Sequence, residues 1–119
     1  MKDFKSLLVW EKSHRLTLAI YKTTSEFPDG ERYGLISQIR RASCSIPANI
    51  AEGCGRNGNQ DFARFMQIAM GSACELEYHL LLARDLKYVD LKEHELLEGE
   101  VIEVKKMLTA LIKKLKTGH

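Results

Sequence analysis

QDFARFMQIAMGSACELEYHLLLARDL, residues 60–86, is the stretch of this chain that decides the fold. Apolar side chains recur along it at alternating steps of four and three residues: Phe62, Met66, Ala69, Ala73, Leu76, Leu80 and Ala83. This spacing places all seven on one face of an α-helix and is typical of helices that cross at about 20°. The stretch therefore predicts a single long helix, of roughly 40 Å, with a continuous inward face.

Three clusters of turn-forming residues divide the rest of the chain: EFPDGERYG (26–34), GCGRNGNQD (53–61) and the weaker LKYVDLKE (86–93). No segment shows the sustained alternation of a strand. We therefore expect four helices, over about 7–26, 31–53, 60–86 and 90–117. Short connections between amphipathic helices predict an all-α fold, an antiparallel up-down-up-down four-helix bundle in one domain over 1–119.

Apolar stripes and end signals support the other three helices. Ser6 is the expected N-cap of the first helix, and Asp90 with Glu93 three residues on forms a capping-box pattern for the last. The predicted inward residues are Val9, Leu16, Ile20 and Phe27 in the first helix, Leu35, Ile39, Ala42, Ile46 and Ile50 in the second, and Leu97, Val101, Val104, Leu108, Leu111 and Leu115 in the fourth.

Composition excludes several classes of protein. The 119 residues carry a net charge of +2, which is too small to indicate a nucleic-acid binder by itself. No apolar run approaches the roughly 18 residues that a membrane span needs, and the N-terminus does not resemble a signal peptide, so we expect a cytoplasmic protein. Three cysteines without a CxxC pair predict reduced thiols, buried or half-buried as small core residues.

The helix over 60–86 has more apolar surface than one inward face requires. Six further apolar residues lie off its main face: Phe65, Ile68, Met70, Tyr78, Leu81 and Leu82. A helix that is apolar nearly all round is buried nearly all round. We expect self-association that covers this helix together with Val9, Trp10 and Tyr21. The alternative is a well-buried central helix in a monomer.

The stretch RRASCSIPANIAEG (40–53) contains Pro47 inside a helical pattern. Proline leaves the Ser43 carbonyl without its helical partner and usually kinks the helix, so we expect a kink at Pro47. A polar line, Arg41, Ser45, Asn49 and Glu52, runs beside the apolar stripe. One interpretation is a structural seam packed closely on Gly71 and Ser72, in which Ser45 and Asn49 satisfy freed backbone groups. Arg41 would then pair with Glu52 or Glu75, either between helices or between subunits. The competing interpretation is a ligand or RNA surface.

The motifs of common enzyme sites are missing from the sequence. Glu11 and His14 form one Glu-x-x-His pair, but a di-iron bundle needs two. Neither a phosphate-cradling glycine loop nor a zinc-protease or serine-hydrolase motif occurs. No histidine is recognisably placed beside a cysteine. We therefore expect a non-enzymatic protein with no catalytic residue, cofactor or metal site.

Five stretches carry a family resemblance: LLVWEKSHRL, FPDGERYGLISQIRRA, SIPANIAEG, DFARFMQIAMGSACELE and LIKKL. Together they resemble the four-helix-bundle family of 23S rRNA intervening-sequence proteins, also called S23 ribosomal proteins. The resemblance implies a ring-like homo-oligomer, a pentamer, associated with inserted segments of large-subunit ribosomal RNA. A related group is the basic pentameric accessory protein of diversity-generating retroelements, which partners a reverse transcriptase.

Exposed basic residues are the predicted RNA contacts. We expect them in the region of the second helix, on the third helix and in the C-terminal tail: Arg32, Arg40, Arg56, Arg64, Lys113, Lys114 and Lys116. The polar turn 56–60 is the expected contact loop. Three functions stay open: an RNA-associated ring, a protein-binding scaffold or accessory ring, and an enzyme with a site between helices.

Overall fold

The computed structural model describes residues 3–117. All the regular secondary structure in this range is helical. It contains α1 (Leu8–Thr24), α2 (Leu35–Cys54), α3 (Asn59–Asp85) and α4 (Leu91–Thr117), with short 3₁₀ turns η1 (Phe4–Ser6) and η2 (Asp29–Glu31). No residue from 3 to 117 is in a strand. The prediction of an all-α four-helix protein is therefore confirmed, with helix ends shifted by a few residues.

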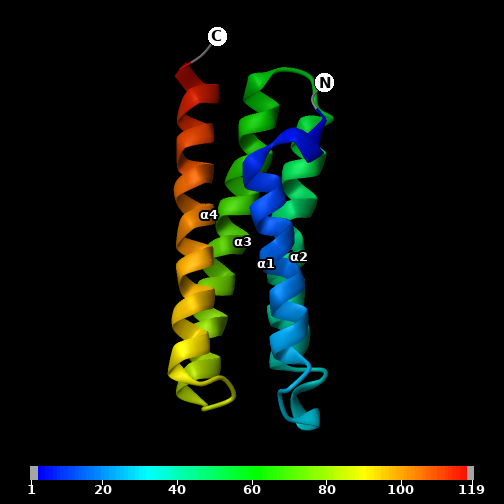
Figure 1. Cartoon of the computed structure of the whole chain (residues 1–119). Coiled ribbons are helices and arrows are strands. Elements are labelled where there is room, and N and C mark those ends of the chain that lie inside the picture. Colours follow the sequence, from blue (N-terminus) through cyan, green and yellow to red (C-terminus); the bar gives the residue numbers. More distant parts are fainter. Residues whose placement is uncertain (1–2, 118–119) are drawn as a thin grey trace.

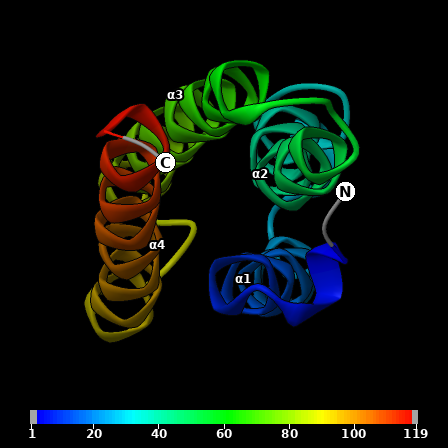
Figure 2. The ribbon, with the colours of Figure 1, turned by 90° about the horizontal axis from the view of Figure 1, so that it is seen from above.

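The four helices lie side by side in an elongated bundle of 47 × 23 × 20 Å. In Figure 1 the chain reverses direction at each connection, so the α2–α3 connection and the end of α4 lie at one end of the bundle. The α1–α2 and α3–α4 connections lie at the other. Seen from above in Figure 2, helices that follow one another in sequence are neighbours in space. In addition, α1 and α4 pack together and complete the bundle.

The core is built from the predicted stripes. In α1, α2 and α3 every residue of the predicted inward faces is buried, as is Phe27 just beyond α1. In α4 the prediction holds from Leu97 to Leu108 but not at the end of the helix. There Ile112 is buried, whereas Leu111 and Leu115 are only partly buried.

Two predicted helix starts were wrong. Ser6 does not cap α1, because it belongs to η1 and its hydroxyl donates to the Asp3 carbonyl. α2 begins at Leu35 rather than near Glu31, since η2 forms a separate turn before it. Glu31 instead accepts the Leu35 amide with its carboxylate, at 3.1 Å, and so satisfies one free N–H at the start of α2.

The start of α4 has half of the predicted capping box. The Asp90 carboxylate accepts the Glu93 amide at 2.7 Å, as an N-cap should. The Glu93 side chain does not close the box. It accepts a hydrogen bond from the Thr23 hydroxyl at 2.8 Å, which joins the beginning of α4 to the end of α1.

Close packing of α2 on α3 occurs at a different glycine from the predicted one. A Cβ on Gly71 would meet nothing within 4 Å, so close approach at Gly71 was wrong. A Cβ on Gly53 would lie 2.8 Å from Met66 Cε and 3.0 Å from Phe65 Cβ. Gly53, at the end of α2, is therefore the residue whose missing side chain lets the two helices meet.

Part of the extra apolar surface of α3 is buried within the chain itself. Phe65 is buried, and Met70 and Leu82 pack partly against the core. Val9 is also buried in the bundle, so its predicted cover by a neighbouring subunit was wrong. Ile68, Tyr78 and Leu81 stay exposed, at 41%, 58% and 37%.

Candidate nucleic-acid interface

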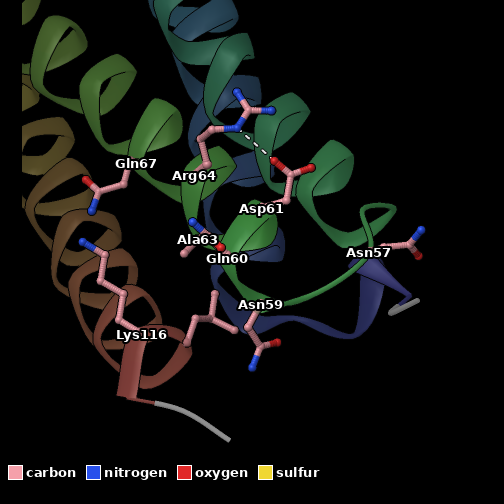
Figure 3. A pocket seen from close by; sticks show the side chains of 9 residues that line it. Asn57, Asn59, Gln60, Asp61, Ala63, Arg64, Gln67 and Lys116 are labelled. Carbon is pink, nitrogen blue, oxygen red and sulfur yellow. Dashed lines mark hydrogen bonds and ion pairs between the residues drawn. The ribbon is translucent and has the colours of Figure 1, made fainter.

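The polar α2–α3 turn and the lysine-rich end of α4 come together at one end of the bundle. An open pocket of about 930 Å³ lies between them, lined by Asn57, Asn59, Gln60, Asp61, Ala63, Arg64, Gln67, Leu115 and Lys116. Figure 3 shows Gln67 of α3 and Lys116 of α4 on the same side of this pocket, with Asn59 near its lower rim. Residues that are about 50 positions apart in sequence thus form one surface, which we call the basic end.

Positive charge dominates the basic end. It carries Arg56, Arg64, Lys113, Lys114 and Lys116 against two carboxylates, Glu52 and Asp61, a formal local charge of +3. Asp3 and Lys5 of the nearby N-terminal turn offset each other. Counted over residues 3–117, this one end therefore holds a larger net positive charge than the whole chain, whose net charge is +2.

The three lysines are the cations of the basic end that no carboxylate of residues 3–117 neutralises. Lys113, Lys114 and Lys116 are exposed, and none of them pairs with a carboxylate in the part of the chain that the structure describes. Lys114 and Lys116 lie in the last turn of α4, where cations are favoured by the helix dipole. They are free to meet the phosphates of a nucleic acid.

The two predicted arginines of the basic end are already paired. Arg56 lies 2.9 Å from Glu52 and 3.8 Å from Asp61, and Arg64 lies 2.9 Å from Asp61. Both guanidinium groups also lie over the ring of Phe65, at 4.7 and 4.5 Å from its centroid. A phosphate would have to compete with these carboxylates, so Arg56 and Arg64 are weaker candidates than the lysines.

The other two predicted contacts are not at this end. Arg32 is exposed in the α1–α2 connection, at the opposite end of the bundle (Figure 1). Arg40 lies on α2 and is fixed to α1: it donates to the Thr24 hydroxyl at 2.8 Å and to the Tyr21 carbonyl at 3.2 Å. Its guanidinium also stacks over the Tyr21 ring, 4.6 Å from the centroid. The structure therefore does not unite the seven predicted residues in one site.

The carbonyl that Pro47 leaves free has a partner on another helix. The Thr17 hydroxyl of α1 lies 3.0 Å from the Ser43 carbonyl and also 3.0 Å from the Ser13 carbonyl of its own helix. Thr17 is buried, so this contact satisfies a polar group that water cannot reach. Sequence reasoning missed Thr17. The kink at Pro47 stays a prediction.

The predicted polar seam exists in part. Ser72 of α3 donates to the Ser45 hydroxyl at 2.8 Å, and Asn49 donates to both the carbonyl and the hydroxyl of Ser45. These contacts tie α2 to α3, as expected for Ser45, Asn49 and Ser72. Ser45 and Asn49 do not, however, satisfy the Ser43 carbonyl.

The predicted ion pair of Arg41 with Glu52 or Glu75 does not form within the chain. Arg41 is exposed and donates to the Gln38 amide oxygen at 3.0 Å. Glu52 pairs with Arg56, and Glu75 lies 3.8 Å from His79. The sequence predicted that Arg41 is held in the seam and that Arg40 is exposed. The structure shows the reverse: Arg40 is fixed against α1, and Arg41 is exposed.

At the opposite end, Glu31 joins two connections of the bundle. Its second carboxylate oxygen accepts a hydrogen bond from the Tyr88 hydroxyl at 2.9 Å. This hydrogen bond to a carboxylate raises the pKa of Tyr88 above its usual value.

Between α3 and α4, Lys105 donates to Glu77 at 2.6 Å, and this contact raises the pKa of Lys105.

The three cysteines lie apart from the basic end except for Cys54 at the end of α2. Cys54 is buried as predicted, but Cys44 and Cys74 are exposed, so their predicted burial was wrong; none of the three forms a disulfide. Among residues 3–117, no group of three or more His, Cys, Asp and Glu side chains is placed to hold a metal ion. None of the helices in that range is long and apolar enough to cross a membrane.

Fold and site together define a class: an all-α four-helix bundle with basic and amide side chains gathered at one end. The family model for 23S rRNA-intervening sequence proteins matches residues 5–110. The chain belongs to this family, as the resemblance of its five stretches predicted.

A solved structure supports the same assignment. It is a crystal structure of a protein of unknown function from the S23 ribosomal protein family of Bacteroides thetaiotaomicron. The two are 29% identical and superpose with a TM-score of 0.81, over 90% of this chain and 100% of that chain. No curated protein matches this chain.

Proposed function

We propose that this protein is a non-enzymatic, cytoplasmic RNA-binding protein that holds the phosphate backbone of RNA at its basic end. The observation that carries the proposal is the group Lys113, Lys114 and Lys116 beside a pocket lined by amides. Within the described range, these lysines have no carboxylate partner. Lysine neutralisation of phosphates supplies affinity, and side-chain amides can hydrogen-bond to base edges or sugars. The family's name makes a structured segment of 23S ribosomal RNA the first partner to test.

A salt titration of RNA binding tests this proposal. Each phosphate contact contributes roughly 0.7–0.9 to the slope of log affinity against log salt concentration. Replacing Lys113, Lys114 and Lys116 together with glutamine should therefore lower this slope by about 2–3 units and weaken binding at low salt. The measurement is fluorescence anisotropy with a structured ribosomal RNA fragment over a range of salt concentrations.

A matched control removes the same charge from the opposite end. Lys22, Lys87 and Lys92 are exposed and lie near the end of α1, in the α3–α4 connection and in the first turn of α4. Their glutamine variant carries the same net charge as the first triple variant. Equal losses of affinity in both variants would mean that only overall charge matters, and would contradict a site at the basic end.

We further propose that the chain forms a homo-oligomer, a pentamer by its family resemblance. Ile68, Tyr78 and Leu81 on α3 are large apolar side chains that the single chain leaves exposed. Burial of such side chains contributes about 1.5–3 kcal/mol each relative to full exposure. Light-scattering mass should exceed that of one chain and should fall when Ile68 and Leu81 are both replaced by glutamate. A mass of one chain for the parent protein at micromolar concentration would contradict this.

A protein-binding scaffold is the second candidate function, similar to the accessory protein of diversity-generating retroelements. It is favoured by apolar side chains exposed on the outer faces of α1 and α4, among them Leu8, Leu18 and Leu96. Under this alternative, RNA would not bind, or would bind with no salt dependence beyond that of the control variant.

A further inference from the structure

The outward face of α2 carries a second group of positive charges, Arg40 and Arg41, apart from the basic end. A shallow open groove of about 490 Å³ lies there, beside α1. Its lining includes Tyr21 of α1 and five residues from three successive turns of α2: Ser37, Arg40, Arg41, Cys44 and Ser45. No lining residue is acidic, whereas the pocket of the basic end contains Asp61.

The two arginines of this groove differ from most arginines of the molecule. Arg15, Arg56, Arg64 and Arg84 each lie within 4 Å of a carboxylate. Arg40 and Arg41 do not pair with any carboxylate among residues 3–117; they bind a hydroxyl, a carbonyl and an amide oxygen. Their charges are therefore not neutralised inside the chain.

Arg41 supplies most of the free donors. It is exposed, and one of its terminal nitrogens donates to Gln38, which holds the side chain in place along α2. A guanidinium group has five N–H donors in a planar fork, so the remaining ones can point to a ligand. Arg40 adds a second positive charge whose position is fixed by Thr24 and the Tyr21 ring.

Ser45 adds a neutral hydroxyl to the lining of the groove. Its oxygen accepts a hydrogen bond from the Asn49 amide at 3.0 Å and lies 2.8 Å from the Ser72 hydroxyl. Hydroxyl protons rotate, so Ser45 can direct its proton to a ligand when the Ser72 hydroxyl donates to it. The same contacts hold the hydroxyl in a fixed place, because they come from α3 and from the next turn of α2.

We propose that this groove binds a phosphate group through Arg41, Ser45 and the charge of Arg40. A guanidinium fork matches the oxygens of phosphate better than a point charge does, and a neighbouring hydroxyl donates to a further oxygen. The groove contains donors and cations without a competing carboxylate, which is the arrangement that an anion requires. Arg41 lies thirteen residues before Cys54, the last residue of α2, which is about 20 Å along the helix from the basic end. The groove is therefore a site of its own.

Small phosphate ligands test the groove separately from RNA binding at the basic end. The probes are inorganic phosphate, AMP and the dinucleotide UpU, which contains only an internal phosphodiester. In residue-resolved NMR titrations of the full chain, the backbone amides of residues 37–48, apart from Pro47, should shift. Tighter binding of AMP would indicate a free nucleotide as the source of phosphate, and tighter binding of UpU an RNA backbone. If no probe shifts these amides, the proposal is wrong.

Variants of Arg41 give the decisive comparison. Arg41→Gln should weaken phosphate binding in the groove about tenfold or more, the usual cost of a lost charged hydrogen bond. Arg41→Lys should bind with intermediate affinity, because it keeps the charge and loses the fork. Arg15→Gln, on the exposed face of α1, is the control and should bind like the parent.

Two other results would overturn the proposal. One is a phosphate affinity that Arg41→Gln leaves unchanged. The other is a lower light-scattering mass for Arg41→Gln with unchanged phosphate shifts, which would make the groove a contact between subunits. The lysine triple variant at the basic end should leave the phosphate-induced shifts of residues 37–48 unchanged. Loss of RNA binding at the basic end can therefore be told apart from loss of phosphate binding in the groove.

Discussion

Two glycines of this bundle should respond oppositely to the same substitution. An alanine at position 53 would place its Cβ 2.8 Å from Met66 Cε, 3.0 Å from Phe65 Cβ and 3.1 Å from Phe62 Cδ1. Met66 Cε ends a flexible side chain, but Phe65 Cβ is attached directly to the backbone of α3. The helices would therefore have to move apart, and such overpacking costs about 1–3 kcal/mol.

Alanine also has a higher helix propensity than glycine, and the resulting stabilisation differs between positions 53 and 71. In a helix interior the gain over glycine is about 1 kcal/mol, but Gly53 is the second-last residue of α2 and would receive only part of it. Gly53→Ala should thus be destabilising by about 1–2 kcal/mol. Gly71 is exposed inside α3 with no atom near its Cβ position, so Gly71→Ala should be stabilising by about 0.5–1 kcal/mol.

Urea unfolding followed by circular dichroism measures both effects. The two variants should differ in unfolding free energy by about 2 kcal/mol, with equal dependence on urea. Light-scattering mass should be measured for each variant, so that stabilities are compared in the same assembly. The reasoning would be refuted if Gly53→Ala were as stable as the parent, or if Gly71→Ala were the less stable of the two.

Two further predictions concern polar contacts between helices. Thr17→Val should lower the unfolding free energy by about 1–2 kcal/mol, because it leaves the Ser43 carbonyl unpaired. The loss should be smaller in a Pro47→Ala background, where the amide of residue 47 can donate to that carbonyl. Additive losses of the two substitutions in urea unfolding would contradict this. Tyr88 has a raised pKa in the folded state, so its contact with Glu31 should stabilise the fold below about pH 10 and lose this effect as pH rises through the raised pKa. Ultraviolet titration of tyrosinate should show that pKa return toward about 10 in Glu31→Gln, and an unchanged titration would show that the contact is absent in solution.

The helices could be predicted because their apolar spacing is long and regular. The stripe of α3 is buried at every predicted position. The stripe of α4 departs from the prediction only at its end, where Ile112 is buried while Leu111 and Leu115 are partly buried.

Contacts between helices could be predicted less well, because they depend on how the helices are rotated against each other. Thr17 gives no local signal: a threonine next to an apolar residue in α1 is as compatible with solvent as with a carbonyl of α2. Gly71 and Gly53 are equally plausible as points of close approach in the sequence. Only the packing of α2 on α3 decides that Gly53 faces Phe65 and Met66 while Gly71 faces outward.

The adjacent arginines of α2 show how this limit affects function. Successive helical residues point about 100° apart, so two neighbouring arginines can meet different surroundings, and the sequence does not say which of them faces another helix. The position of α1 decides between them: Arg40 meets Tyr21 and Thr24, and Arg41 is left beside Ser45. The segment around Pro47 therefore has two roles on two faces. Its inner face needs Thr17 for the carbonyl that proline frees, and its outer face gathers donors without a carboxylate. A structural seam and a ligand surface were competing interpretations of this stretch. Ser45 forms the seam with Ser72 and Asn49, and it also lines the groove that we propose to bind phosphate.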